Sequence, residues 1–60
     1  MKDPIELELE IIRETRLAVR FSDGDREEWI PKSLIEYEGK VGETVVVMMP
    51  EWVAFDNGFI

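Results

Sequence analysis

The chain has 60 residues, which suffices for one small domain and is too short for two hydrophobic cores. It contains neither cysteine nor histidine, which excludes disulfides, thiolate sites and imidazole metal sites. The formal charge is −7, so the chain as a whole repels nucleic acid. Because a core of this size is marginally stable, we expect a homo-oligomer to supply further buried surface.

From the distribution of apolar residues we expect neither a membrane span nor an export signal. No apolar run approaches the roughly 20 residues that a bilayer span needs. The Met-Lys-Asp-Pro start lacks the apolar core of a signal peptide. We therefore expect a soluble, cytoplasmic protein without a membrane partner.

Apolar and acidic residues alternate with a period of two over residues 5–11, which predicts a half-buried strand with four aliphatic side chains on one face. Ile12 breaks the alternation and predicts a bulge or bend, with residues 13–16 as the connection. The next segment resumes the period and is expected to point three side chains inward: Leu17, Val19 and Phe21.

A tight hairpin is expected at Ser22-Asp23-Gly24-Asp25, because glycine accepts positive φ and aspartate caps its own backbone. A three-residue loop places Trp29 on the inward face. A loop of two or four residues places Trp29 beside Arg20 and turns Ile30 inward. We expect Trp29 to be inward or half-buried, with the other register as the alternative.

The second half of the chain is divided by prolines and glycines. Pro31 ends the strand and opens a single helical turn that places Leu34 or Ile35 in the core. Residues 37–43 form a glycine-punctuated loop. The β-branched run 44–49 predicts a strand that is covered on both faces or by a partner subunit.

Residues 50–55 begin with proline and glutamate, which is typical of a helix start, and Asn57-Gly58 predicts its end. We expect this helix to cover the open end of the sheet with Trp52, Val53 or Phe55. Residues 1–60 therefore form one mainly β domain. The expected architecture is a small, strongly bent antiparallel sheet or barrel, SH3-like or OB-like, with a short C-terminal helix.

The residues that could carry catalysis or bind a metal are few. The hydroxyls of Thr15, Ser22 and Ser33 have no histidine to act as their base, so we expect no enzyme. Four carboxylates cluster near the hairpin tip, at Asp23, Asp25, Glu27 and Glu28. They lack the further oxygen ligands and the spacing of a calcium loop, so we expect neither a metal site nor a cofactor.

Three arginines form the one positive stretch: Arg13, Arg16 and Arg20. They could bind phosphate through bidentate guanidinium pairs, but cross-strand pairing with glutamates is the simpler interpretation. Four aromatic residues could form a stacking platform or, more simply, the core: Trp29, Trp52, Phe55 and Phe59. A lysine stem lying over the sheet and a serine that fastens the turn would explain Lys32 and Ser33 structurally.

A binding site would draw on the positive, aromatic and hydroxyl groups left over. The candidate ligand-binding residues are Arg20, Trp29, Lys32, Ser33 and Trp52. We expect no catalytic residue among them.

The segment from Val19 to Ile35, followed by Met49-Pro50-Glu51-Trp52-Val53 and by Gly58-Phe59-Ile60, resembles a family of very short bacteriophage and prophage proteins. These proteins share a Trp-Ile-Pro-Lys-Ser core and a Pro-Glu-Trp ending. The resemblance implies a phage accessory protein in the host cytoplasm and transfers no catalytic residue. The chain departs from the family pattern at Leu34, where a polar residue such as glutamine would be expected.

Phage accessory proteins of this size often counter host defence, so three functions follow as expectations. The first is a non-enzymatic module that sequesters a small, anionic, nucleotide-type ligand in an oligomer, since two subunits can enclose a pocket that one cannot. The second is an acidic inhibitor of a host protein that mimics DNA, because alternate carboxylates of one strand lie roughly 7 Å apart. The third, a single-strand nucleic-acid accessory protein, is disfavoured by the negative charge.

Overall fold

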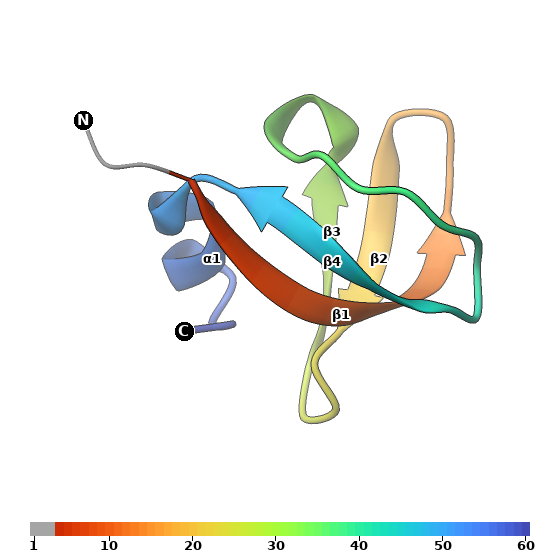
Figure 1. Cartoon of the computed structure of the whole chain (residues 1–60), viewed down its shortest axis with the longest axis horizontal. Coiled ribbons are helices and arrows are strands. Elements are labelled where there is room, and N and C mark those ends of the chain that lie inside the picture. The colour runs from red at the N-terminus through yellow and green to blue at the C-terminus, as the bar shows by residue number, and fades with distance from the viewer. Residues whose placement is uncertain (1–3) are drawn as a thin grey trace.

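Four strands form one antiparallel sheet with the order β3-β2-β1-β4 (Figure 1). This computed structural model describes residues 4–60. The strands are β1 (Ile5–Glu14), β2 (Ala18–Ser22), β3 (Glu27–Pro31) and β4 (Thr44–Met49). A 3₁₀ turn, η1 (Lys32–Leu34), follows β3, and the helix α1 (Glu51–Asp56) follows β4. The predicted class, mainly β with a strongly bent antiparallel sheet and a short C-terminal helix, is confirmed; the sheet is open and does not close into a barrel.

The long strand β1 connects the two halves of the sheet. Residues Ile5 to Glu10 pair with β4, and residues Glu10 to Glu14 pair with β2. The predicted bulge is confirmed, because the register shifts between Ile11 and Arg13. An extra residue in one strand increases the local twist and bends that strand. One continuous strand therefore serves both halves of a curved sheet.

The core lies on the inner face of the bend. Its buried members are Leu9, Ile11, Val19, Phe21, Ile30, Val47, Met49, Val53 and Ala54. The first strand contributes the alternate aliphatic residues that its period predicts. Leu34 and Ile35 pack against this core from η1 and the residue after it, as expected from the proline-started turn.

The four-residue loop of the β2–β3 hairpin decides which side chains of β3 face the core. Ser22 pairs with Glu27, so residues 23–26 form the loop, with Gly24 at φ +101°. With this loop length Trp29 lies opposite Arg20, and Ile30 is buried. The expected inward placement of Trp29 is therefore wrong, and the alternative register is correct.

Four further side chains are more exposed than the sequence predicts. Leu17 lies in the bend before β2 and is 70% exposed. In α1, Val53 and Ala54 are buried, so Trp52 and Phe55, three residues apart on the other face, remain 57% and 70% exposed. Val46 is also exposed, so β4 is covered on its inner face only.

The helix ends as predicted at Asn57-Gly58. The Phe59 N–H donates to the Ala54 carbonyl at 2.9 Å, and the Gly58 N–H donates to the Phe55 carbonyl at 3.1 Å. This is the Schellman pattern, in which the residue after the cap takes a positive φ, here +78° at Gly58. A side chain at Gly58 would also require the guanidinium of Arg26 to move. The motif turns Phe59 back against the core.

Within residues 4–60, no helix has the length and apolarity needed to cross a membrane.

Truncating a core residue of β2 tests this assignment of faces. We expect Phe21→Ala to lose about 3–5 kcal/mol of unfolding free energy, because it removes a fully buried ring from the centre of the core. This loss is comparable to the whole stability of a domain of this size. The control Leu17→Ala should change the unfolding free energy by less than about 0.5 kcal/mol, because Leu17 is exposed. Urea unfolding followed by circular dichroism measures both, and equal losses would contradict the placement of Leu17 outside the core.

Candidate functional site

A row of basic and aromatic side chains crosses the outer face of the sheet. The register places Arg13 of β1 opposite Arg20 of β2, and Arg20 opposite Trp29 of β3. Directly paired residues of adjacent strands lie on the same face. These three residues, which we call the outer row, therefore lie side by side on the face opposite the core.

Arg20 stands at the centre of the outer row. Its Nε lies 2.9 Å from Oε1 of Glu27, and both side chains are about two-fifths exposed. The Nε–H does not align with that oxygen, so the buried Nε makes no hydrogen bond within residues 4–60. The contact is thus an ion pair without a directed hydrogen bond, and exposed pairs of this kind are weak. Because Nε is buried while the side chain as a whole is 41% exposed, an anion from solvent would have to bind Arg20 through the terminal amino groups of its guanidinium.

The arrangement on either side of Arg20 favours an anionic aromatic ligand. Arg13 is exposed and is a second cation directly opposite Arg20, an arrangement that repels in the absence of an anion. On the other side the indole of Trp29 is 41% exposed. A phosphate between the guanidinium groups would relieve their repulsion, and a base could stack on the indole.

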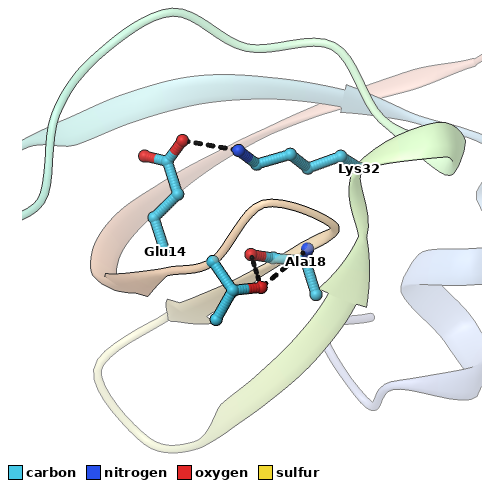
Figure 2. A network of polar contacts seen from close by, with 4 residues as sticks. Glu14, Ala18 and Lys32 are labelled. Atoms are coloured by element: carbon cyan, nitrogen blue, oxygen red, sulfur yellow. Dashed lines mark hydrogen bonds and ion pairs between the residues drawn. The ribbon is translucent and has the colours of Figure 1, made fainter.

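Lys32 is separate from the outer row and pairs with Glu14. Figure 2 shows its Nζ donating to Oε2 of Glu14 at 2.7 Å, with both side chains about one-third exposed. In the register of β1 and β2, Glu14 lies opposite Val19, whose side chain faces the core. The Glu14 carboxylate therefore lies at the rim of the inner face. The backbone N–H of Lys32 also donates to the Leu17 carbonyl at 2.8 Å. Lys32 thus ties η1 to the β1–β2 turn.

The protonation equilibria around this pair reflect the same contact. The hydrogen bond from Lys32 holds the pKa of Glu14 below its usual value, and the hydrogen bond to Glu14 raises the pKa of Lys32. Partial burial, together with the neighbouring Glu14 carboxylate, raises the pKa of Tyr37. All three shifts favour the charged pair beside a neutral phenol at neutral pH.

The remaining predicted site residues lie elsewhere. The Ser33 hydroxyl makes no hydrogen bond to another described residue, so it does not fasten the turn as its structural interpretation required. It lines a hollow of about 220 Å³, together with Pro4, Leu34, Ile35, Glu36, Met48, Met49 and Pro50. Trp52 lies exposed on α1. The structure thus brings Arg20 and Trp29 together and leaves Lys32, Ser33 and Trp52 outside that pair.

A second hollow, of about 500 Å³, has an acidic lining. It is formed by Glu6, Glu36, Tyr37, Glu38, Val46 and Met48. Three carboxylates disfavour an anion there. Among residues 4–60, no group of three or more acidic side chains is arranged to hold a metal ion.

Sequence reasoning missed two members of these arrangements. Arg13 was recognised as basic but was not assigned to the site with Arg20, because residues 13–16 were expected to form a connection. That expectation is wrong: β1 continues past the bulge to Glu14 and so pairs Arg13 with Arg20. Glu14 was not identified as the partner of Lys32, which lies 18 positions later in the chain. The break at Ile12 was the available signal for both.

No protein-family model, no curated protein and no solved structure matches this chain. Its function has to be inferred from its own residues and their arrangement.

The Glu14–Lys32 contact predicts a pH-dependent contribution to stability. Because the folded chain lowers the pKa of Glu14, this contribution is present above the unfolded pKa of the carboxyl and is lost as the pH falls through the folded pKa. We expect Lys32→Met to lower the urea midpoint at pH 7 and to match the unmodified protein once the pH is well below about 4. Urea unfolding at several pH values measures the convergence.

The matched control is Lys40→Met, which removes the same charge at an exposed position in the 37–43 loop. A Lys32→Met difference that is independent of pH, or that Lys40→Met reproduces, would show that the ion pair with Glu14 is not its cause.

Proposed function

We propose that this chain is a non-enzymatic binding module that holds a small, anionic, nucleotide-type ligand on the outer row and works as a homo-oligomer. The observation that carries the proposal is the cross-strand pair of Arg20 and Trp29, with Arg13 on the far side of Arg20. A guanidinium next to an exposed indole offers one group to a phosphate and one to a base.

The chemistry of the ligand follows from the difference between the outer row and its surroundings. The chain carries −7 overall, yet two arginines stand directly opposite each other in this row. Stacking of a base on an aromatic side chain contributes about 1–3 kcal/mol. A bidentate hydrogen-bonded contact between arginine and phosphate fixes the orientation of the phosphate and strengthens its binding. A nucleotide supplies both groups in one small molecule.

The hydrogen-bond partners of the Thr15 and Ser22 hydroxyls support a binding role. Thr15 Oγ1 is engaged with the backbone of Ala18, and Ser22 Oγ accepts the Gly24 N–H at 3.0 Å. Within residues 4–60 neither hydroxyl, nor that of Ser33, contacts a side chain that could act as its base, which nucleophilic catalysis requires. Capture of a ligand needs no such base.

The resemblance to short phage proteins supports the biological setting of the proposal. In that setting the module is a phage accessory protein in the host cytoplasm, and its ligand is a nucleotide signal of host defence. Sequestration requires tight binding of the ligand and enough copies of the protein, and it requires no catalysis. A small chain that encloses its ligand between subunits can meet these requirements.

Fluorescence titration in a Trp52→Phe background tests the site, because Trp29 is then the only indole. The probes are ATP, a cyclic dinucleotide and a short single-stranded oligonucleotide. We expect a nucleotide to quench Trp29, and Arg20→Gln to weaken binding at least about tenfold through loss of a charge-assisted contact. Trp29→Leu, measured by calorimetry, should weaken it by a similar factor.

Arg16→Gln is the matched control, because it removes the same charge from an exposed bend outside the outer row. It should bind within about twofold of the unmodified protein, allowing for screened long-range attraction. Equal affinity of Arg20→Gln and the unmodified protein would disprove the site. Binding of the oligonucleotide alone, weakening steeply with salt, would favour the single-strand function instead.

A second candidate function is supported by the acidic face of β1. Glu6, Glu8 and Glu10 alternate on the outer face, opposite Met48, Val46 and Thr44 of β4. Such a row could dock a basic surface of a host protein, as in a DNA-mimicking inhibitor.

Capture from a host lysate by immobilised protein tests the inhibitor function. If it is correct, a host protein is retained at low salt and released at high salt, and the triple substitution of Glu6, Glu8 and Glu10 by glutamine abolishes retention. A triple variant with the same charge change elsewhere is the control: Asp25→Asn, Glu28→Gln and Asp56→Asn. Equal retention by both triple variants would contradict docking through β1.

A further inference from the structure

The two edges of the sheet differ in how they are covered. At the β4 edge, Glu36 forms a bridge with Met48: the Glu36 N–H donates to the Met48 carbonyl at 2.9 Å, and the Met48 N–H donates back at 2.8 Å. Within residues 4–60, no strand or bridge lies on the outer side of β3. The bridge covers one outward position of β4, whereas no outward position of β3 has such a bridge, so the β3 edge is the less covered of the two. Open edges tend to pair with another strand.

The hydrogen bonds at the two ends of the β2–β3 ladder show which backbone groups of β3 face outward. The Asp23 N–H donates to the Arg26 carbonyl at 3.2 Å, and the Lys32 N–H donates to the Leu17 carbonyl at 2.8 Å. Since bonded and non-bonded pairs alternate in an antiparallel ladder, Glu28 and Ile30 bond to β2. The outward groups are then those of Glu27, Trp29 and Pro31. Those of Glu27 and Trp29 bond to no described residue outside the ladder, whereas the Pro31 carbonyl, at the N-cap of η1, accepts the first bond of that turn.

The outward groups of β3 complement those of a second, antiparallel β3. The edge presents N–H groups at Glu27 and Trp29 only, because Pro31 has none. It presents unbonded carbonyls at Glu27 and Trp29, and at Pro31 a carbonyl that keeps one lone pair beside its bond in η1. In a two-fold pair centred on Trp29, each Trp29 N–H meets the Trp29 carbonyl of the second copy. Each Glu27 N–H meets the Pro31 carbonyl of the second copy. Every outward donor then has an acceptor.

The charges along β3 favour the same antiparallel register. Glu27 and Glu28 begin the strand, and Lys32 follows its end. Because Lys32 is already paired with Glu14, the advantage of an antiparallel copy is that it keeps the acidic ends of the two strands apart. A parallel copy would place the glutamates of both strands together, in a chain that already carries −7.

We propose that two copies of this chain pair through the open edge of β3 to form one continuous eight-stranded sheet. This inference rests on the homo-oligomer of the proposed function and identifies its interface. The pairing joins the two outer rows, so that the second copy contributes another Trp29, Arg20 and Arg13 to the same surface. The ligand site then spans both subunits, with two adjacent indoles at its centre and arginines on both sides.

Glu27→Pro tests the interface, because it removes an outward N–H and leaves the β2–β3 ladder bonds in place. Glu27→Ala is the matched control, since it keeps that N–H and equally loses the contact with Arg20. By light scattering and sedimentation without ligand, we expect the unmodified protein and Glu27→Ala to be dimers. Glu27→Pro should dimerise at least about tenfold more weakly through the loss of two symmetric hydrogen bonds.

A cysteine at position 29 provides a second measurement that leaves every backbone hydrogen bond intact. The two positions would be about 5.5 Å apart between Cα atoms, within the range of a disulfide. In a chain without other cysteines, Trp29→Cys should oxidise to a covalent dimer at least about tenfold faster than Val46→Cys at dilute concentration. Val46 is similarly exposed on β4 and does not face itself in the pair.

The proposal is overturned by any of three results: an unmodified protein that stays monomeric, a Glu27→Pro variant that is folded and dimerises normally, or Trp29→Cys oxidising no faster than Val46→Cys. Arg20→Gln should keep the dimer even where it loses the nucleotide. Loss of the dimer with nucleotide binding retained would overturn the interface alone, so failure of the interface and failure of the ligand site are distinguishable.

Discussion

The bulge at Ile12 is the constraint on which both polar arrangements depend. In a strand with strict alternation, Arg13 would follow Ile11 on the core face and Glu14 would lie outside. The extra residue reverses this order, so that Arg13 stands opposite Arg20 and Glu14 stands opposite the buried Val19. The same irregularity bends β1 around the core. One inserted residue thus sets the curvature, the outer row and the Glu14–Lys32 contact together.

The outer row departs from what stability alone would select. Like charges directly across two strands destabilise a sheet, and Arg13 faces Arg20 on the surface of an acidic chain that has many carboxylates to pair with. Violations of local rules concentrate at functional sites, where another gain offsets the cost. An anion between the two guanidinium groups would be such a gain. The exposed part of the Arg20 side chain is where such an anion would bind.

The Trp29-Ile30-Pro31-Lys32-Ser33 run combines structural and surface roles. Ile30 fills the core, Pro31 ends β3, and Lys32 connects η1 to Glu14. These roles explain much of the run without any ligand. Trp29 is different, because its indole is exposed beside Arg20 and its backbone groups face an open edge. A surface function of this run therefore depends first on Trp29.

The sequence by itself determined the mainly β class, the bulge, the hairpin, the proline-ended strand and the helix stop at Asn57-Gly58, because each depends on local periodicity or on the backbone preferences of proline and glycine. Only the tertiary structure decided which side chains are exposed. The length of the hairpin loop turned Trp29 outward, and the six-residue helix buried Val53 instead of Trp52. Partners far apart in the chain, such as Glu14 and Lys32, also required the folded register. Local patterns specify backbone conformation, whereas register and packing depend on contacts that no local pattern contains.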